Sequence, residues 1–209
     1  MNINSVLAVL ATLAILLALA NISVTLMKVN DFDKLTGFAA GYVNITVNTQ
    51  ATINFSQDIV NWSSGTIIPP NKNASLSTNG AGSATIARGN WSASAHALVL
   101  ANIGNVNVTL TLQSSKDAAD FFGGSAGDRA YQWNISNKEG SSCTLAGAGN
   151  IVLDQWKDVN KSVAKACGNF SFDQDHNEIF IDIKMVVPYD AQYTDSLQTG
   201  TITATGSSS

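Results

Sequence analysis

The chain has 209 residues, a formal net charge of −4 at pH 7 and only 12% charged residues. Because this composition offers no basic patch that could hold a phosphate backbone, it argues against a nucleic-acid-binding protein. Beyond an apolar N-terminal stretch, roughly 170 residues remain, which is enough for one domain with a hydrophobic core.

The first 27 residues carry no charged side chain, and residues 5–27 read SVLAVLATLAILLALANISVTLM. An apolar helix of about 20 residues matches the hydrocarbon core of a bilayer. The apolar pattern continues to Leu35 and stops at Thr36 and Gly37, and glycine is common just past a helix end. We therefore expect a hydrophobic helix within residues 1–36, inserted in a membrane through residues 5–27, and an extracellular domain over residues 37–209.

Three interpretations of this helix compete. A cleavable secretory signal fits least well, because residues 1–4 lack the basic start of such signals. A permanent single-pass anchor expects Lys or Arg on its cytoplasmic flank, whereas Lys28 and Lys34 lie on the other side of the span. A helix freed from a basic leader ending just before Met1, and then packed against its own copies, explains the bare flank. Small residues let such helices approach closely, and the candidates are Ala8, Ala11, Ala14, Ala18 and Ala20.

Apolar and polar residues alternate along much of the remaining chain, as in half-buried strands. For example, Val108, Leu110 and Leu112 alternate with threonine. The predicted strands lie within residues 42–56, 97–113, 178–188 and 200–206. The predicted loops cover residues 63–89, 123–127 and 137–150, and short helices are expected at most at residues 114–122 and 154–166. Several strands separated by Gly- and Asn-rich turns favour a mainly β, antiparallel sandwich.

The chain has two cysteines, Cys143 and Cys167. They form no C-x-x-C pair, which argues against a zinc site. In an exported chain an isolated pair most simply forms a disulfide. Closing a loop of about 25 residues would stabilise the fold by roughly 3.5 kcal/mol in the chain-entropy model.

The sequence contains ten N-x-[S/T] sequons, many more than its Asn, Ser and Thr content produces by chance. In a strand the acceptor and the hydroxyl residue share one face, and the middle residue points the other way. The middle residues Ile45, Phe55, Trp62, Trp91, Val108 and Phe170 are therefore predicted to lie in the core. Asn21 lies in the apolar helix and is expected to stay unmodified. The predicted glycosylation sites are Asn44, Asn54, Asn61, Asn73, Asn90, Asn107, Asn134, Asn160 and Asn169.

Acidic residues gather in two stretches, but neither completes a known site. The D-x-D-x-N spacing of Asp173, Asp175 and Asn177 lacks the glycine and the glutamate of a calcium loop, so a solvated turn before a strand is expected. No nucleophile, metalloprotease or phosphate-loop motif is present. We therefore expect no enzyme activity, no metal and no cofactor. The remaining polar candidates, expected to be structural, are Asp117, Asp120, Asp128, His96, His176 and Glu178.

Two passages carry a resemblance to known proteins. Residues 98–113 read LVLANIGNVNVTLTLQ, which is a strand, an N-x-G-N turn and a second strand. Residues 181–206 read IDIKMVVPYDAQYTDSLQTGTITATG, which is a strand, a Pro-led turn and a final strand. Together they resemble small immunoglobulin-like sandwiches of prokaryotic cell surfaces, including matrix-fibre and bundling-pilus subunits. The whole layout resembles archaeal surface proteins of the type IV pilin-like class, although Ser5 stands where many pilins carry an acidic residue.

The resemblance implies an N-terminal apolar helix followed by an antiparallel immunoglobulin-like β-sandwich. It also implies a structural subunit of an archaeal extracellular filament, with the helices in the core and glycosylated β-domains outside. The partners would be copies of the chain itself, after a stage in the membrane. The alternative is a single-pass membrane-anchored surface glycoprotein or adhesin that binds a partner cell or envelope component.

Overall fold

The computed structural model describes residues 7, 10–19, 45–46, 48–92, 95–124, 127–144, 151–192 and 197–208. The chain divides into two units, an N-terminal unit, Met1–Val47, and a β unit, Asn48–Ser209. The domain boundary predicted after residue 36 falls among residues outside this description.

In the N-terminal unit, residues 10–19 are helical. The large apolar side chains of this helix and of Leu7 are between 55% and 63% exposed. No helix within the described residues is both long and apolar enough to cross a membrane. Most of the predicted span over residues 5–27 lies outside the described residues, as do the packing candidates Ala8 and Ala20.

The β unit is built from antiparallel strands. Across the described residues, 43% lie in strands and 10% in helix, so the chain is mainly β. A single labelled helix, α2 (Ala118–Phe122), interrupts the strands. The strands are β1 (Ile53–Gln57), β2 (Asn73–Asn79), β3 (Gly82–Ala87), β4 (Leu98–Asn102), β5 (Val108–Ser114), β6 (Ala130–Asn137), β7 (Cys143–Thr144), β8 (Lys157–Asp158), β9 (Ala164–Phe170), β10 (Glu178–Pro188) and β11 (Ile202–Ser208).

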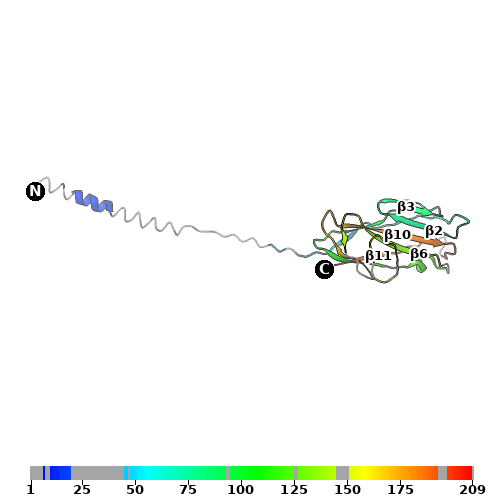
Figure 1. The fold of residues 1–209 in the computed structure, drawn as a ribbon. Helices are drawn as coiled ribbons and strands as arrows, with labels where there is room; N and C mark the ends of the chain where they lie inside the picture. Colours follow the sequence, from blue (N-terminus) through cyan, green and yellow to red (C-terminus); the bar gives the residue numbers. More distant parts are fainter. Residues whose placement is uncertain are drawn as a thin grey trace. The chain divides into compact units, whose positions relative to one another are not determined.

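The first sheet is organised around the long strand β10, which lies beside β2 and β6 in Figure 1. One edge of β10 pairs with β6 over residues 179–186. Its other edge is shared, because residues 178–181 pair with β4 and residues 184–188 pair with β2. Strands β1, β3 and β8 extend the sheet from β4, β2 and β6 respectively. The pairing partner along this edge of β10 therefore changes from β4 to β2 near Asp182.

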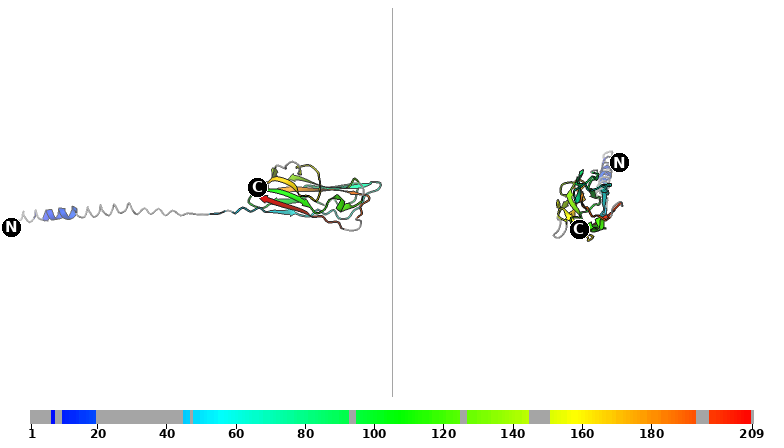
Figure 2. Two further views of the ribbon diagram at one scale, coloured as in Figure 1. Left: turned by 90° about the horizontal axis from the view of Figure 1, so that it is seen from below. Right: turned by 90° about the vertical axis from the view of Figure 1, so that its right-hand side faces the viewer.

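The second sheet has the order β11–β5–β9–β7. The axes of its strands are roughly aligned with those of the first sheet (Figure 2). One hydrophobic core receives side chains from both sheets. The first sheet contributes Leu98, Leu100, Trp133, Ile135, Ile179, Ile181 and Ile183, and the second contributes Val108, Leu110, Leu112, Cys143, Ala166, Cys167 and Phe170. Burial of these apolar side chains at about 1.5–3 kcal/mol each is the main favourable contribution to folding.

Several expected elements are confirmed. The alternating stretches at residues 97–113, 178–188 and 200–206 overlap β4, β5, β10 and β11. The short helix expected within residues 114–122 is α2. Asp117 and Asp120 form a capping box that satisfies backbone N–H groups at its start.

Other expectations were wrong. The stretch predicted as a loop, residues 63–89, contains β2 and β3, and the possible helix at residues 154–166 is replaced by β8 and the start of β9. Within residues 42–56, the described strand begins only at Ile53. Ile45, predicted to lie in the core, is 83% exposed because it precedes the paired part of the chain.

Candidate functional site

Eight of the nine predicted glycosylation sites are described, and they fall into two groups by exposure. Asn44 lies outside the described residues. The exposed group consists of Asn54, Asn61, Asn90 and Asn160, and the half-buried group consists of Asn73, Asn107, Asn134 and Asn169. A glycan is bulky and must project into solvent, so the two groups differ in their ability to carry one.

At Asn61 and Asn160 the sequon folds back on itself. The Asn61 Oδ1 accepts a hydrogen bond of 2.8 Å from the backbone N–H of Ser63. The Asn160 Oδ1 accepts one of 3.1 Å from the backbone N–H of Ser162. This is the Asx turn, in which the side chain bonds the backbone two residues later. It holds the amide oxygen and leaves the Nδ2 of each acceptor without a partner among the described residues.

Asn90 is held by a second loop rather than by its own sequon. Its Oδ1 accepts hydrogen bonds from the backbone N–H of Thr66 at 2.6 Å and from the Thr66 hydroxyl at 3.3 Å. The Asn90 N–H donates in return to the Thr66 carbonyl at 3.2 Å. Farther along, Ser92 N–H donates to the Trp62 carbonyl at 3.3 Å. The two N-W-S sequons, residues 61–63 and 90–92, are therefore joined into one pair of loops.

The ring of Trp91 packs against the backbone of both loops. A Cβ atom added to Gly65 would lie 2.4 Å from the Trp91 ring, and one added to Gly89 would lie 2.5 Å from it. Only glycine lets the backbone approach the indole so closely. The half-buried ring thus packs against both loops while the neighbouring Asn90 stays exposed.

The half-buried sequons hold their acceptors differently. The Asn73 Nδ2 donates to the carboxylate of Asp128. The Asn107 Oδ1 accepts from the N–H of Phe172 at 3.2 Å. The Asn134 Oδ1 is buried and has no hydrogen-bond partner among the described residues. At Asn73, Asn107 and Asn134 the amide is therefore engaged with, or enclosed by, the fold.

The apolar middle residues of the sequons follow the predicted direction to different degrees. Val108 and Phe170 are fully buried in the core, as predicted. Phe55, Trp62 and Trp91 are only half-buried, so their predicted place in the core was correct in direction alone.

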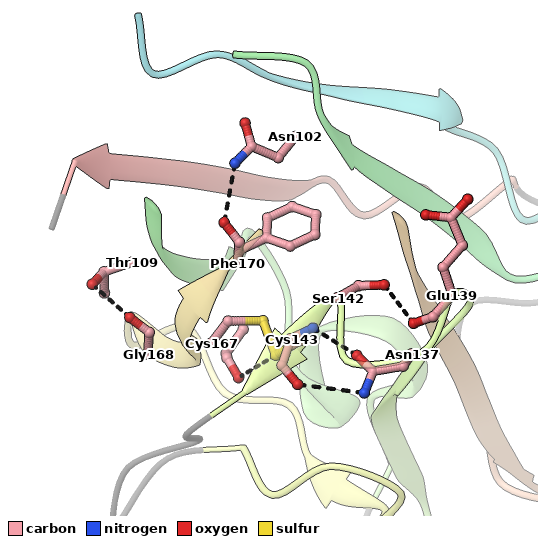
Figure 3. The surroundings of a disulfide bond; sticks show 10 residues. Asn102, Thr109, Asn137, Glu139, Ser142, Cys143, Cys167, Gly168 and Phe170 are labelled. Atoms are coloured by element: carbon pink, nitrogen blue, oxygen red, sulfur yellow. Dashed lines mark hydrogen bonds between the residues drawn. A yellow bond between two sulfur atoms is a disulfide. The ribbon is translucent and has the colours of Figure 1, made fainter. Parts of the chain in front are cut away.

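The predicted disulfide is formed between Cys143 on β7 and Cys167 on β9 (Figure 3), and it is confirmed. Both cysteines are buried in the core. Asn137 holds the start of β7 on both sides, because its Oδ1 accepts from the Cys143 N–H at 2.7 Å and its Nδ2 donates to the Cys143 carbonyl at 3.4 Å. The bond ties a two-residue edge strand to the sheet that it borders.

Asn102 forms a polar link between the two sheets, which the sequence did not indicate (Figure 3). It is 0% exposed and ends β4. Its Nδ2 donates to the carbonyls of Val106 and Phe170, each at 3.0 Å, and its Oδ1 accepts from Gly104 N–H at 3.1 Å. A buried amide with three partners is well satisfied, so this side chain both closes the β4–β5 turn and connects β4 to β9.

A second buried polar group lies where β10 changes its strand partner. The Asp182 Oδ1 accepts hydrogen bonds of 2.7 Å from the Thr78 hydroxyl and from Gly80 N–H. The Thr78 hydroxyl accepts in turn from Ile183 N–H at 2.9 Å. These bonds take the place of strand pairing between the start of β4 and the end of β2, so the carboxylate satisfies backbone that would otherwise be orphaned.

The acidic residues near α2 are structural. The Lys161 Nζ lies 3.0 Å from the Asp120 Oδ2 and 3.8 Å from the Asp117 Oδ2. The backbone hydrogen bond from Asp117 and the bond from Lys161 lower the pKa of Asp120, and the same carboxylates raise the pKa of Lys161. Asp128, grouped with them from the sequence, instead binds Asn73.

A shallow hollow beside α2 is lined by Asp117, Arg129, Tyr131, Asp158 and Asn160. The Arg129 Nη1 is committed to the fold, because it donates to the carbonyls of Gly123 and Gly124. Burial raises the pKa of Tyr131. The ionisable groups in the hollow are thus held by neighbouring structure rather than gathered around a vacant centre.

The acidic stretch before β10 forms a turn, as predicted. The His176 N–H donates to the Asp173 carbonyl at 2.7 Å. Asn177 donates from its Nδ2 to the Asn102 carbonyl at 3.1 Å, and Glu178 is ion-paired with Lys138. Within the described residues, no group of three or more His, Cys, Asp or Glu side chains is placed to hold a metal ion.

Comparisons with protein-family models, with curated proteins and with solved structures find no match for this chain.

Proposed function

We propose that this chain is a structural subunit of an extracellular filament of the archaeal type IV pilin-like class. The N-terminal helices form the filament core and the β units form its outer surface. Before assembly the helix resides in the membrane through residues 5–27. The observation that carries the proposal is a helix whose large apolar side chains are exposed on all sides but one, and whose remaining side is lined by exposed alanines.

The angular positions of these side chains support the proposal. At about 100° per residue, counted from Leu10, the side chains of Leu13, Ile15, Leu16 and Leu19 fall near 300°, 140°, 240° and 180°. Each of them is more than half exposed. A helix that is apolar all round requires burial in a large assembly or a membrane. Burying each Leu or Ile contributes about 1.5–3 kcal/mol relative to water.

The alanines of the helix occupy the side that the large residues leave. Ala11, Ala14 and Ala18 fall within an arc from about 40° to 100° on the same count. Lipid is as apolar as leucine, so helices leave the membrane for a bundle only if close packing favours it. Small residues on one side permit such close packing. This arc is therefore the contact face that we assign to the helix in the filament.

We further infer that the β unit is an immunoglobulin-like β-sandwich. Its support is one core that receives side chains from two antiparallel sheets. A disulfide and a buried amide that bridges the sheets give the unit the resistance to unfolding that a coat outside the cell requires. Glycans on the exposed sequons would shield its surface and edges. In this proposal the unit has no catalytic role and needs no cofactor.

The alternative is a single-pass surface glycoprotein or adhesin. A bilayer would cover the apolar helix as completely as a filament core does, so exposure of large side chains does not separate the two functions. The alanine arc does, because an isolated anchor gains nothing from a face of small residues.

Replacement of Ala14 by leucine tests this face in the native cell. The added side chain should block close helix packing and reduce the polymer that shearing releases, while the membrane level of the subunit stays unchanged. Leu16→Met is the matched control, because it preserves volume on the opposite side and should leave polymer yield intact. Unchanged polymer yield in the Ala14→Leu variant would contradict the proposed contact face.

A further inference from the structure

We propose that glycans are transferred to the folded β unit, and that its structure selects Asn54, Asn61, Asn90 and Asn160 and refuses Asn73 and Asn134. This inference rests on the proposed function only in that the chain is exported to a cell surface. All six residues belong to the same N-x-S sequence class. A preference among them that is present in the folded chain and absent in the unfolded chain must therefore come from structure.

The chemistry of transfer sets what an acceptor must offer. The Asn Nδ2 attacks the anomeric carbon of a sugar carried on a lipid phosphate or diphosphate. A bond forms between Nδ2 and that carbon, the bond from the carbon to the phosphate oxygen breaks, and the Nδ2 proton leaves with the phosphate. The nitrogen must be open to the donor and the amide must be able to turn its nitrogen outward.

Three of the selected residues meet this requirement in the same way. Asn61, Asn90 and Asn160 are exposed, and each has its Oδ1 held by a backbone N–H, from Ser63, Thr66 and Ser162 respectively. Fixing the oxygen directs the Nδ2 of the same amide away from the backbone. These residues also lie in loops, so an enzyme can surround the tripeptide without opening a sheet.

Asn54 is exposed for a different reason. It lies on β1, a strand that pairs only with β4, and it points away from the core while Phe55 points towards it. The second edge of β1 has no strand partner among the described residues. The side chain of Asn54 is thus approachable from the outer face of the sheet.

Asn134 lacks each of these features. It lies on β6, where all three residues of its sequon pair with β10 and Asn134 itself lies opposite Asp182, while β8 pairs with the two preceding residues along the other edge. Its Oδ1 is buried without a hydrogen-bond partner among the described residues. An enzyme would have to remove a strand to surround this tripeptide.

Asn73 is excluded as an acceptor because its side-chain nitrogen is already hydrogen-bonded. Its Nδ2 donates to the Asp128 carboxylate, and its side chain is half-buried at the start of β2. A hydrogen bond to an ionised acceptor is about twice as strong as a neutral one. The attacking atom is therefore occupied, and transfer would first require that bond to break.

The test uses the full chain, produced without glycosylation and dispersed as a monomer in detergent. It is incubated with a sequon-specific oligosaccharyltransferase and a lipid-linked oligosaccharide, beside a short N-W-S peptide that reports enzyme activity. Glycopeptide mass spectrometry then compares the folded, oxidised chain with the reduced and unfolded chain. We expect at least tenfold faster transfer to each of the four exposed residues than to Asn73 or Asn134 when folded, and comparable rates when unfolded.

Two further measurements make the test decisive. Ser63→Ala removes the hydroxyl but keeps the backbone N–H that holds Asn61, so transfer should stop at Asn61 and continue at Asn90. If the unmodified chain does not fold, occupancy is mapped on the chain from its own cells. Equal modification of Asn134 and Asn61 in folded protein, or no transfer to either state while the peptide is modified, would overturn the proposal. Because the chain is monomeric here, failure to polymerise in cells leaves this result untouched.

Discussion

Replacement of Asn102 by aspartate tests whether one buried amide holds the two sheets together. The native Nδ2 donates to the carbonyls of Val106 and Phe170 from a fully buried position. A carboxylate has nearly the same shape but offers no donor, while it can still accept from Gly104 N–H. The change therefore removes two hydrogen bonds and faces two carbonyl oxygens with negative charge.

The expected loss follows from what is left unpaired. A buried polar group that loses its partner costs about 1–3 kcal/mol. Two orphaned carbonyls therefore cost about 2–6 kcal/mol, and burial of an ionised carboxyl adds to this at neutral pH. Domains are stable by about 5–15 kcal/mol in total, so Asn102→Asp should remove a large share of the free energy of unfolding.

The loss should also depend on pH in a defined direction. Burial disfavours the charged form, so the pKa of the new carboxyl is raised in the folded state above its unfolded value of about 3.9. Below that value the carboxyl is protonated in both states and the deficit is smallest. The deficit grows as pH rises above it and levels off once the folded-state pKa has been passed.

Urea unfolding followed by tryptophan fluorescence measures this effect, because Trp133 is 1% exposed in the shared core. Asn61→Asp is the matched control, since it makes the same chemical change at an exposed position and should stay within about 0.5 kcal/mol of the native chain. A loss below about 1 kcal/mol for Asn102→Asp, with an unchanged slope against urea, would refute the role assigned to this amide.

Three other changes have expected outcomes. The double variant C143A/C167A should lose about 3.5 kcal/mol in the same urea assay, and alkylation of the native chain without reductant should label no thiol. Asp182→Ala removes the acceptor of the Thr78 hydroxyl and of Gly80 N–H, at the point where β10 changes its strand partner. The free energy of unfolding should fall by about 2–5 kcal/mol, and a change within about 0.5 kcal/mol would argue against the role assigned to this carboxylate. Lys161→Met should raise the pKa of Asp120 towards its ordinary value in an NMR titration. Since the native pKa is lowered, the stability from this pair is present above the unfolded pKa and disappears as pH falls through the folded one.

Strand periodicity succeeded where the buried residues are large. In β10, Ile179, Ile181 and Ile183 recur at every second position and all three are buried. In β2 the buried positions are Ala74, Leu76 and Thr78, so the core-facing side carries only one large apolar residue. A sheet that buries small and polar residues leaves too little contrast for a period of two to be recognised.

The polar links could not be predicted because they depend on distant pairing. The carbonyl that Asn102 binds belongs to Phe170, 68 residues later, and the residue that meets Asp182 is Thr78, 104 residues earlier. The contacts of the sequons likewise depend on residues that are distant in the sequence. Alternation predicted which way each acceptor points, but the partner of Asn73 is fixed only once Asp128 is brought beside it.

Mechanical shearing of intact cells, followed by intact-mass analysis and N-terminal sequencing of the released material, tests the central proposal most directly. The proposal predicts a sedimentable polymer of this subunit, released without detergent and starting at a processed N-terminus with its apolar helix retained. Recovery only from detergent-solubilised membranes, as a monomer, would contradict it and favour the single-pass surface glycoprotein.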